Sequence, residues 1–322
     1  MHFPRKDRNG VAAIAPADDR FRHIRFLSAT EFAASASARP RSAAIPVGGC
    51  HRDVPRVEPE PLEPEARRFV EWLLKQAGVD PDGYRAAPLA RRIRACLRCL
   101  RARSVTEARQ RLTREPQRVA EAVSALLIGV TQFFREPEVF SYVDKVVLPG
   151  LSAGGAGLRI WSAGCADGAE LYSVAMLLAG RGLLEGSELF GSDCRADAIR
   201  RARRGWFDAT QLQSLEEPLR QAYFVPRQRG WQVCDVLRHS TRWLQGDALA
   251  GPPLGQPSWD LIFCRNVAIY LQPSAAARLW TVLAGSLRPG GVLVVGKAER
   301  PERQSSLAYL APCVFGKGGL SR

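Results

Sequence analysis

Two apolar runs of this 322-residue chain end in residues that can bind a ligand. The first run, 158–162, leads into a turn bounded by Gly164 and Gly168 and then into a helical pattern. Glycines let a backbone approach a ligand closely, and the helix that follows begins with unsatisfied N–H groups. By itself this turn fits a cofactor site and an ordinary strand–helix turn equally well. The dinucleotide spacing of three glycines is absent, which argues against NAD.

The second run, 259–264, ends in polar residues where the opposite wall of such a site should lie: Cys264, Arg265 and Asn266. A third run, 188–192, is followed by Asp193. An acidic side chain at the end of that strand typically accepts both hydroxyls of a cofactor ribose. Asp193 has an alternative role as the cap of a helix that begins near Ala196. We favour the ribose role because of the glycine turn.

Short apolar runs alternate with helical patterns after residue 149, which predicts a mainly parallel sheet covered on both faces. The expected strands are 158–162, 188–192, 241–245, 259–264 and 291–296, and the expected helices lie near 169–179, 196–204 and 273–287. Two further β-type segments, 223–225 and 231–236, predict a small inserted hairpin near 206–240.

Residues 61–148 carry helical periodicity, with Ser104 and Glu107 spaced as a capping box, and predict a small all-α domain. Residues 1–60 are rich in Ala, Ser, Arg and Pro and predict a disordered extension and linker. The expected catalytic domain then covers 149–322.

Composition limits the partners and the compartment. Lys and Arg number 46 against 32 Asp and Glu, so the net charge of +14 favours acidic partners without naming their kind. No apolar run reaches the roughly 18 residues of a membrane span, and the first residues lack a signal-peptide core. Eight cysteines spread through the predicted elements favour a reducing compartment, and they do not form a metal-ligand pattern. We expect a soluble, cytoplasmic, monomeric protein without a metal site or membrane insertion.

Three motifs in a fixed order resemble a known family, the chemotaxis-receptor glutamate methyltransferases of CheR type. They are Gly129–Glu136, Ser162–Ser173 and Cys264–Tyr270, and the similarity extends from about Arg67 to Gly318. The resemblance implies a Rossmann-like, class I methyltransferase domain that uses S-adenosylmethionine. It also implies a substrate, the glutamate side chains on the cytoplasmic methylation helices of membrane chemoreceptors.

The glycine turn and the resemblance together assign a site. The expected cofactor contacts are Thr131, Arg135, Gly164, Gly168, Glu170, Asp193, Asp247, Ala248, Cys264, Arg265 and Asn266, and the expected catalytic residues are Arg135 and Tyr270. The chain departs from the family at Gly129, where Asn is usual, at Ala169, where Glu is usual, and at Asp247, where Asn is usual. A cofactor-poor signalling scaffold is therefore one alternative.

A predicted helix carries six arginines between 91 and 103. Such a run is usually a solvated face, whereas in the family a basic helix faces the acidic receptor. Both interpretations stay open, and the docking residues would be Arg92, Arg94, Arg98 and Arg101. A nucleic-acid methyltransferase would also explain the charge, but the strand ending at Cys264 lacks the Asn-Pro-Pro-aromatic turn of base methylation. We therefore expect no stable nucleic-acid partner.

Overall fold

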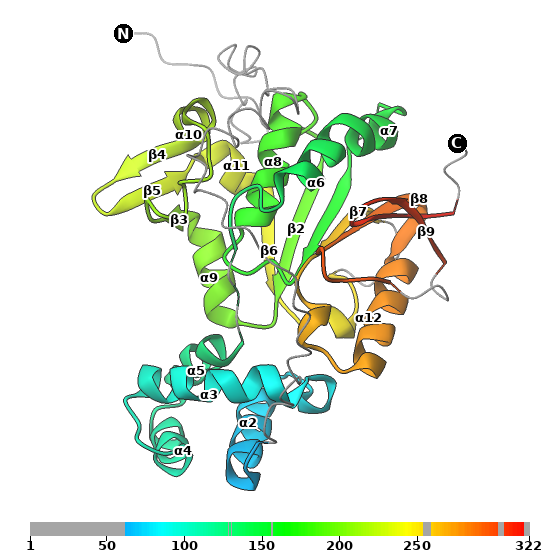
Figure 1. Cartoon of the computed structure of the whole chain (residues 1–322). Coiled ribbons are helices and arrows are strands. Elements are labelled where there is room, and N and C mark those ends of the chain that lie inside the picture. The colour runs from blue at the N-terminus through cyan, green and yellow to red at the C-terminus, as the bar shows by residue number, and fades with distance from the viewer. Residues whose placement is uncertain are drawn as a thin grey trace, which may run out of the picture.

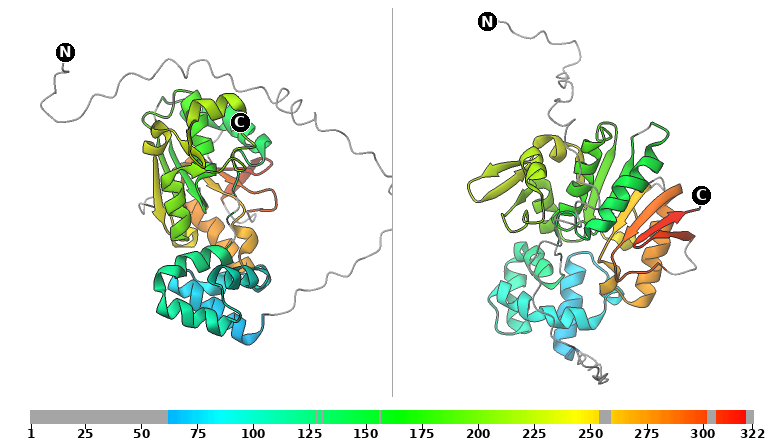
Figure 2. Two further views of the ribbon diagram at one scale, coloured as in Figure 1. Left: turned by 90° about the vertical axis from the view of Figure 1, so that its left-hand side faces the viewer. Right: turned by 45° about the horizontal axis from the view of Figure 1, so that its top comes forward.

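The computed structural model describes residues 62–318 except 128, 130, 156, 254–258 and 302–305. The predicted extension 1–60 lies outside the described residues. Four helices come first and lie together below the sheet in Figure 1: α2 (Pro64–Gln76), α3 (Ala86–Leu100), α4 (Val105–Arg114) and α5 (Val119–Leu126). The two turned views in Figure 2 show the same helices gathered at one end of the molecule.

The helical region has a core of its own. Each helix buries one apolar face, and the fully buried positions include Leu73, Leu74, Cys96, Leu100 and Ala108. The helix start predicted from the capping-box spacing is confirmed with Ser104 as the cap, but the Glu107 side chain accepts from the residue before the cap and not from Ser104 N. Glu107 N donates to Ser104 Oγ at 3.1 Å, and the Glu107 carboxylate accepts from Arg103 N at 2.8 Å.

A seven-stranded sheet follows, in the order β6-β2-β1-β7-β8-β10-β9. The segment before it contains α6 (Pro137–Tyr142), η4 (Val143–Val147) and α7 (Leu148–Ser152). The strands are β1 (Arg159–Ala163), β2 (Glu188–Asp193), β6 (Thr241–Gln245), β7 (Trp259–Cys264), β8 (Leu287–Val295), β9 (Leu307–Ala311) and β10 (Val314–Lys317). The first five pair in parallel, and β10 pairs antiparallel to both β8 and β9. The predicted α/β, Rossmann-like fold is confirmed.

The strand order reverses beside β1, and this positions the site. From β1 the chain moves outward through β2 to β6, and it then returns to the other side of β1 as β7. In open α/β sheets, ligands bind outside the carboxyl ends of the strands at such a reversal. The connecting helices are α8 (Ala169–Gly180), α9 (Ala196–Arg204) and α12 (Pro273–Ser286).

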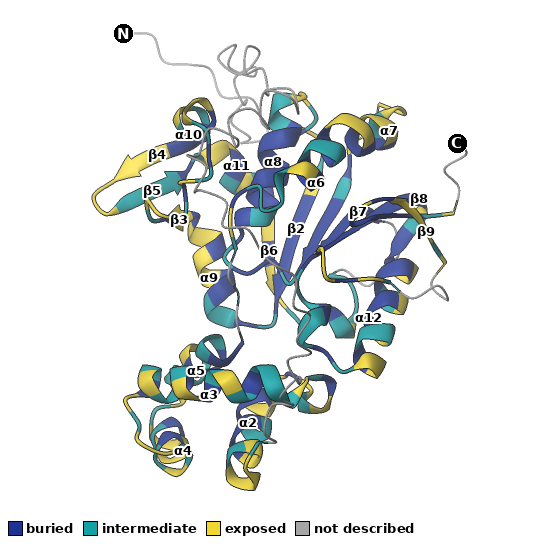
Figure 3. Ribbon diagram, in the orientation of Figure 1, coloured by how far each residue is buried: buried dark blue, intermediate teal, exposed yellow. Residues whose placement is uncertain are grey.

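The central strands β1, β2, β7 and β8 are largely buried, as Figure 3 shows by the dark ribbons at the centre of the molecule, whereas the edge strands β6 and β9 are partly exposed. Trp161, Trp259 and Phe263 are fully inaccessible to solvent, and Trp161 and Trp259 pack with ring centroids 5.9 Å apart. Strands that are buried on both faces form continuous apolar runs in the sequence, which explains why these runs predicted their positions. In the described part of the chain, no helix is long and apolar enough to cross a membrane.

Two predicted elements differ from those observed by more than a single residue at an end. Strand β8 begins at Leu287, whereas we expected it at 291, because Leu287 pairs with Trp259 before an irregularity in the register, and Gly290 adopts a φ of +78°. The inserted hairpin is β4 (Phe224–Arg227) with β5 (Gly230–Val233), and it gains a third strand, β3 (Trp206–Phe207). After β5, the residues from Asp235 form helix α11 (Asp235–His239). The division of the chain into domains stays a prediction.

Candidate cofactor site

A cavity of about 340 Å³ lies where the carboxyl ends of the central strands meet the helical region. It is lined by residues from both parts of the chain. Of the predicted site residues, the lining includes Arg92, Thr131, Arg135, Gly164, Glu170, Asp193, Asp247, Ala248, Arg265, Asn266 and Tyr270. The lining does not include Gly168, Cys264, Arg94, Arg98 or Arg101. The fold thus brings together most of a set that is scattered along the sequence.

The two glycines of the turn after β1 have different structural roles. Gly164 has a φ of +76° and lies on the cavity wall, where an added Cβ would be 2.5 Å from Val267 Cγ2. Gly168 has a φ of +95° and precedes α8, and its Cβ would lie 2.7 Å from the Trp243 ring. Only Gly164 therefore borders the space for a ligand, whereas Gly168 allows α8 to pack.

Asp167, in the same turn, is an unusual carboxylate. Its Oδ2 accepts from Gln211 Nε2 at 2.9 Å, while its buried Oδ1 has no hydrogen-bond partner among the described residues. Burial raises the pKa of Asp167 to about 6, against hydrogen bonds that lower it. The ionised form of this side chain is therefore held at a cost to the folded state.

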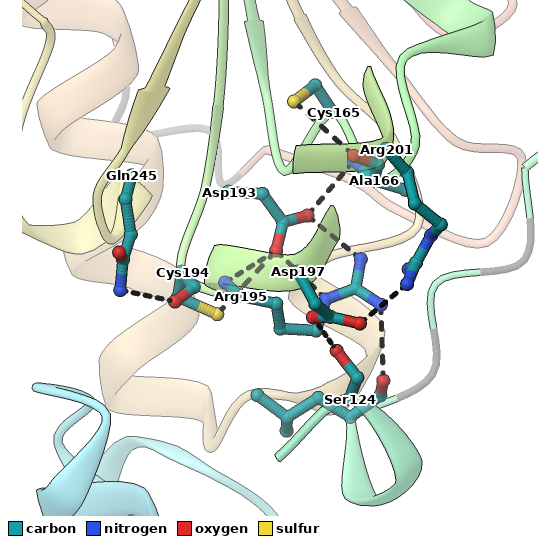
Figure 4. Close-up of polar contacts among 10 residues, drawn as sticks. Ser124, Cys165, Ala166, Asp193, Cys194, Arg195, Asp197, Arg201 and Gln245 are labelled. Carbon is teal, nitrogen blue, oxygen red and sulfur yellow. Dashed lines mark hydrogen bonds and ion pairs between the residues drawn. The ribbon is translucent and has the colours of Figure 1, made fainter. Parts of the chain in front are cut away.

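Asp193 ends β2 and is buried with 5% of its surface exposed. Its Oδ1 accepts from the backbone N and the Nε of Arg195, both at 2.9 Å, and its Oδ2 accepts from Ala166 N at 3.0 Å and Arg195 Nη2 at 2.9 Å (Figure 4). Helix α9 begins at Ala196, but its first turn has no side-chain cap. The predicted alternative, a capping role for Asp193, is therefore wrong in that form: Asp193 joins the β1 and β2 loops.

Glu170 and Arg265 form a buried pair across the cavity floor. The Glu170 carboxylate accepts from Ser162 Oγ at 2.7 Å and from Arg265 Nη1 at 3.4 Å. Arg265 Nη2 also donates to Arg135 O at 2.6 Å and to Glu136 Oε2 at 2.9 Å. Burial raises the pKa of Glu170, and the nearby Arg265 opposes that rise. Arg265 therefore ties the turn that carries Arg135 to the first turn of α8.

Arg135 projects from a strained turn. Its neighbours Phe134 and Glu136 have φ values of +49° and +61°, which are uncommon for residues other than glycine. Phe134 N donates to Ser173 Oγ at 3.0 Å, and the ring of Phe133 is completely buried. The neighbouring acids Glu136 and Glu138 pair with Arg265 and Lys297. These contacts fix the backbone on both sides of the cavity-lining Arg135.

The loop after β7 is held by Glu299, which is not among the predicted site residues. Glu299 is 2% exposed, and its two carboxylate oxygens accept from four backbone N–H groups at 2.7–2.8 Å: those of Asn266, Val267, Ala268 and Gly296. Asn266 has a φ of +61° within this loop. The sequence contains one signal for this role: Glu299 is a charged residue shortly after β8, and β7 and β8 are parallel neighbours that end at the same edge of the sheet. Glu299 thereby positions the wall that contains Asn266 and Tyr270.

The far wall carries Asp247 and Tyr84. Asp247 Oδ1 accepts from Leu249 N at 3.0 Å and starts the short helix η5 (Ala248–Ala250). Burial raises the pKa of Asp247. Burial also raises the pKa of Tyr84, with smaller contributions from Cys194 and Asp247. Tyr84 comes from the helical region and was not selected from the sequence. Arg85 N donates to Tyr270 O at 2.9 Å and joins the helical region to the loop after β7.

The cavity has the chemistry that the predicted cofactor requires. S-adenosylmethionine carries a sulfonium, an ammonium and a ribose diol, and Glu170, Asp193 and Asp247 supply three carboxylates to the cavity wall. Apolar surface for a purine is supplied by Leu89, Leu126 and Leu127. Four arginines also line the cavity, and two of them, Arg195 and Arg265, pair with Asp193 and Glu170, so individual hydrogen bonds rather than net charge would hold the cofactor. The residues present therefore fit this cofactor.

Comparison with known proteins agrees with the geometry. Residues 129–312 match the family model described as "CheR methyltransferase, SAM binding domain". A chemotaxis protein methyltransferase of Listeria monocytogenes is 30% identical over 240 residues, which cover 74% of this chain and 91% of that protein. The Pseudomonas aeruginosa protein named "Probable biofilm formation methyltransferase WspC" is 32% identical over 72% of this chain, which spans 56% of that relative. The chain belongs to the CheR methyltransferase family and is a methyltransferase that uses S-adenosylmethionine as its cofactor.

Proposed function

We propose that this chain is a protein-glutamate O-methyltransferase that acts, as a monomer in the cytoplasm, on the methylation helices of membrane chemoreceptors. The observation that carries the proposal is a shared cavity. Arg135 and Tyr270, the expected substrate contacts, line the same cavity as Glu170 and Asp193, the expected cofactor contacts. A carboxylate held by the first pair would therefore lie beside a cofactor held by the second.

The reaction needs positioning more than acid–base chemistry. The bound cofactor supplies an electrophilic methyl group. A glutamate side chain has a reference pKa near 4.3 and is already ionised at neutral pH, so no base has to activate it. Correct orientation of two reactants supplies about 7–11 kcal/mol in well-aligned model systems. The protein must therefore exclude water and aim the carboxylate.

Arg135 and Tyr270 can divide that task. The guanidinium can hold one carboxylate oxygen through charge-assisted hydrogen bonds, and the phenol can orient the other. A very tight hold would weaken the nucleophile, because the negative charge of the carboxylate falls in the transition state. The strained turn around Arg135 and the loop held by Glu299 both limit the movement of these side chains.

The exposed arginines of α3 favour an acidic partner, such as the methylation helices of a receptor. The apolar face of α3 is buried through Leu89, Ile93, Cys96 and Leu100, which leaves an exposed stripe of Arg91, Arg94, Arg98 and Arg101. Arg92 has a different environment from the stripe. Its Nε and Nη2 donate to Ala125 O at 3.2 and 3.0 Å, and the residue lines the cavity. We infer that the stripe docks the receptor, while Arg92 joins α3 to α5 and lies on the side of α3 that lines the cavity.

Transfer of labelled methyl groups tests the function. Purified protein is incubated with methyl-labelled S-adenosylmethionine and, in separate reactions, a chemoreceptor cytoplasmic fragment, DNA and RNA. The proposal expects label in the receptor fragment that mild base releases, as for a carboxyl methyl ester. Arg135→Ala should abolish most of this transfer, whereas Arg159→Ala, a change in an arginine on β1 that pairs with Glu188, should not. Label in nucleic acid, or base-stable label, would contradict the proposal.

A further inference from the structure

The Asp193 carboxylate has no free acceptor site in the described structure. An ionised carboxylate offers about four lone-pair positions. Four nitrogen donors, Ala166 N, Arg195 N, Arg195 Nε and Arg195 Nη2, donate into them at 2.9–3.0 Å, and the weak thiol donor Cys194 Sγ lies 3.9 Å from Oδ1. Two of these four donors belong to the Arg195 side chain, whose fork meets both carboxylate oxygens. Figure 4 shows the Arg195 guanidinium directly against Asp193.

Gly129 provides the space for this arrangement. A Cβ at Gly129 would overlap the guanidinium group of Arg195, so no other residue type fits there while Arg195 keeps its position. The third guanidinium nitrogen, Nη1, donates to Leu127 O at 3.3 Å. Arg195 is 6% exposed, and Gly129, Asp193 and Arg195 all border the cavity. Gly129 and Arg195 therefore act as one structural unit on the cavity wall.

We propose that Arg195 sets the cofactor affinity of this chain by competing with the cofactor ribose for Asp193. This inference rests on the assignment of Asp193 to the ribose. Two hydroxyl groups can donate to the carboxylate only where the two side-chain donors of Arg195 withdraw. The hydrogen bond to Leu127 O breaks in the same movement, so cofactor binding also releases a contact between the helical region and the loop after β2.

The size of the effect follows from the population of the open state. When only a fraction of the protein is competent to bind, the apparent dissociation constant rises by the inverse of that fraction. An open population of about one tenth weakens binding about tenfold. Removing the competing guanidinium should therefore tighten binding, which is the opposite of what loss of an ordinary ligand contact does.

Arg195→Met is the informative variant, because methionine keeps much of the apolar stem and has no donor. In this variant the backbone N of residue 195 and Ala166 N can still donate to the Asp193 carboxylate. Calorimetry with S-adenosylhomocysteine should show affinity rising about tenfold over wild type. For the 2′,3′-dideoxy analogue, which has no hydroxyls to offer Asp193, the gain should vanish. Arg201→Met is the matched control, since Arg201 pairs with Asp197 on the same helix and lies outside the cavity lining.

Gly129→Ala provides a second, ligand-free test. In the wild-type background its Cβ displaces Arg195 and should lower the melting temperature. In the Arg195→Met background no guanidinium occupies this space, so Gly129→Ala should lower the melting temperature much less. Equal costs in both backgrounds would show that the two residues are independent and would overturn the pairing.

The outcomes separate this inference from the proposals beneath it. Unchanged or weaker binding of S-adenosylhomocysteine by Arg195→Met, beside normal wild-type binding, overturns the competition and leaves the cofactor assignment intact. An equal gain with the dideoxy analogue also overturns it, because the hydroxyls would then play no part. Failure of the folded wild type to bind S-adenosylhomocysteine would overturn the cofactor site itself.

Discussion

Replacing Glu299 by Gln should destabilise the protein and impair the site together. Either orientation of the amide places its NH2 group against two backbone N–H donors: those of Val267 and Ala268, or those of Asn266 and Gly296. Each buried donor that loses its acceptor costs about 1–3 kcal/mol, so the variant should lose about 2–6 kcal/mol. Since a whole domain has about 5–15 kcal/mol of stability, this loss is large.

Thermal unfolding followed by circular dichroism measures this cost. For a domain of this size the loss corresponds to a fall in melting temperature of about 5–20 °C. Glu188→Gln is the matched control, because Glu188 forms a partly exposed pair with Arg159 at 3.0 Å and should cost no more than about 1 kcal/mol. S-adenosylhomocysteine should also bind more weakly to Glu299→Gln, since Asn266 and Tyr270 line the cavity. A melting temperature of Glu299→Gln within about 2 °C of wild type would show that the four hydrogen bonds to Glu299 do not stabilise the fold.

Three further predictions concern the buried Asp167, the basic stripe and the Tyr270 hydroxyl. The folded-state pKa of Asp167, about 6, lies above the unfolded value of 3.8. The free energy of unfolding therefore falls as the pH rises from the lower value to the higher one. Above pH 7, Asp167→Asn should therefore have a higher melting temperature than wild type, with a gain in the free energy of unfolding of up to about 3 kcal/mol. A series of melting curves should show this gain shrinking as the pH falls toward 4. Reversing Arg94, Arg98 and Arg101 to Glu should slow methylation of a receptor fragment without changing S-adenosylhomocysteine affinity, and added salt should slow the wild type in the same assay. Tyr270→Phe should bind S-adenosylhomocysteine normally but lose about tenfold or more in single-turnover methyl-ester formation, and a wild-type rate would remove the hydroxyl from the mechanism.

Apolar runs located most of the sheet from the sequence. The predicted strands at 241–245 and 259–264 have the bounds of β6 and β7, and the predicted helix at 196–204 has the bounds of α9. Strand β7 is buried throughout, and β6 and α9 each bury one face, so their apolar residues form continuous or periodic patterns that one window can detect. Strand β3 (Trp206–Phe207) has only two residues and carries no period, which is why it was missed.

The candidate site was predictable where each residue follows a strand or a turn, and not where it depends on a distant partner. Asp193 and Arg265 come directly after apolar runs. Arg195 and Glu299 do their work through contacts that the chain order does not reveal: Arg195 fills the space at Gly129, and Glu299 reaches back to the loop after β7. A local pattern contains no information about which backbone donors a fold will leave unpaired.

The most direct test of the central claim is the position of the transferred methyl group. A chemoreceptor cytoplasmic fragment is treated with the protein and isotopically labelled S-adenosylmethionine, digested, and analysed by tandem mass spectrometry. We expect labelled methyl esters on glutamate side chains of the receptor's methylation helices, with Arg135→Ala protein giving a greatly reduced yield. Label on lysine, on cysteine or on backbone termini, or an unlabelled fragment beside normal binding of S-adenosylhomocysteine, would contradict it.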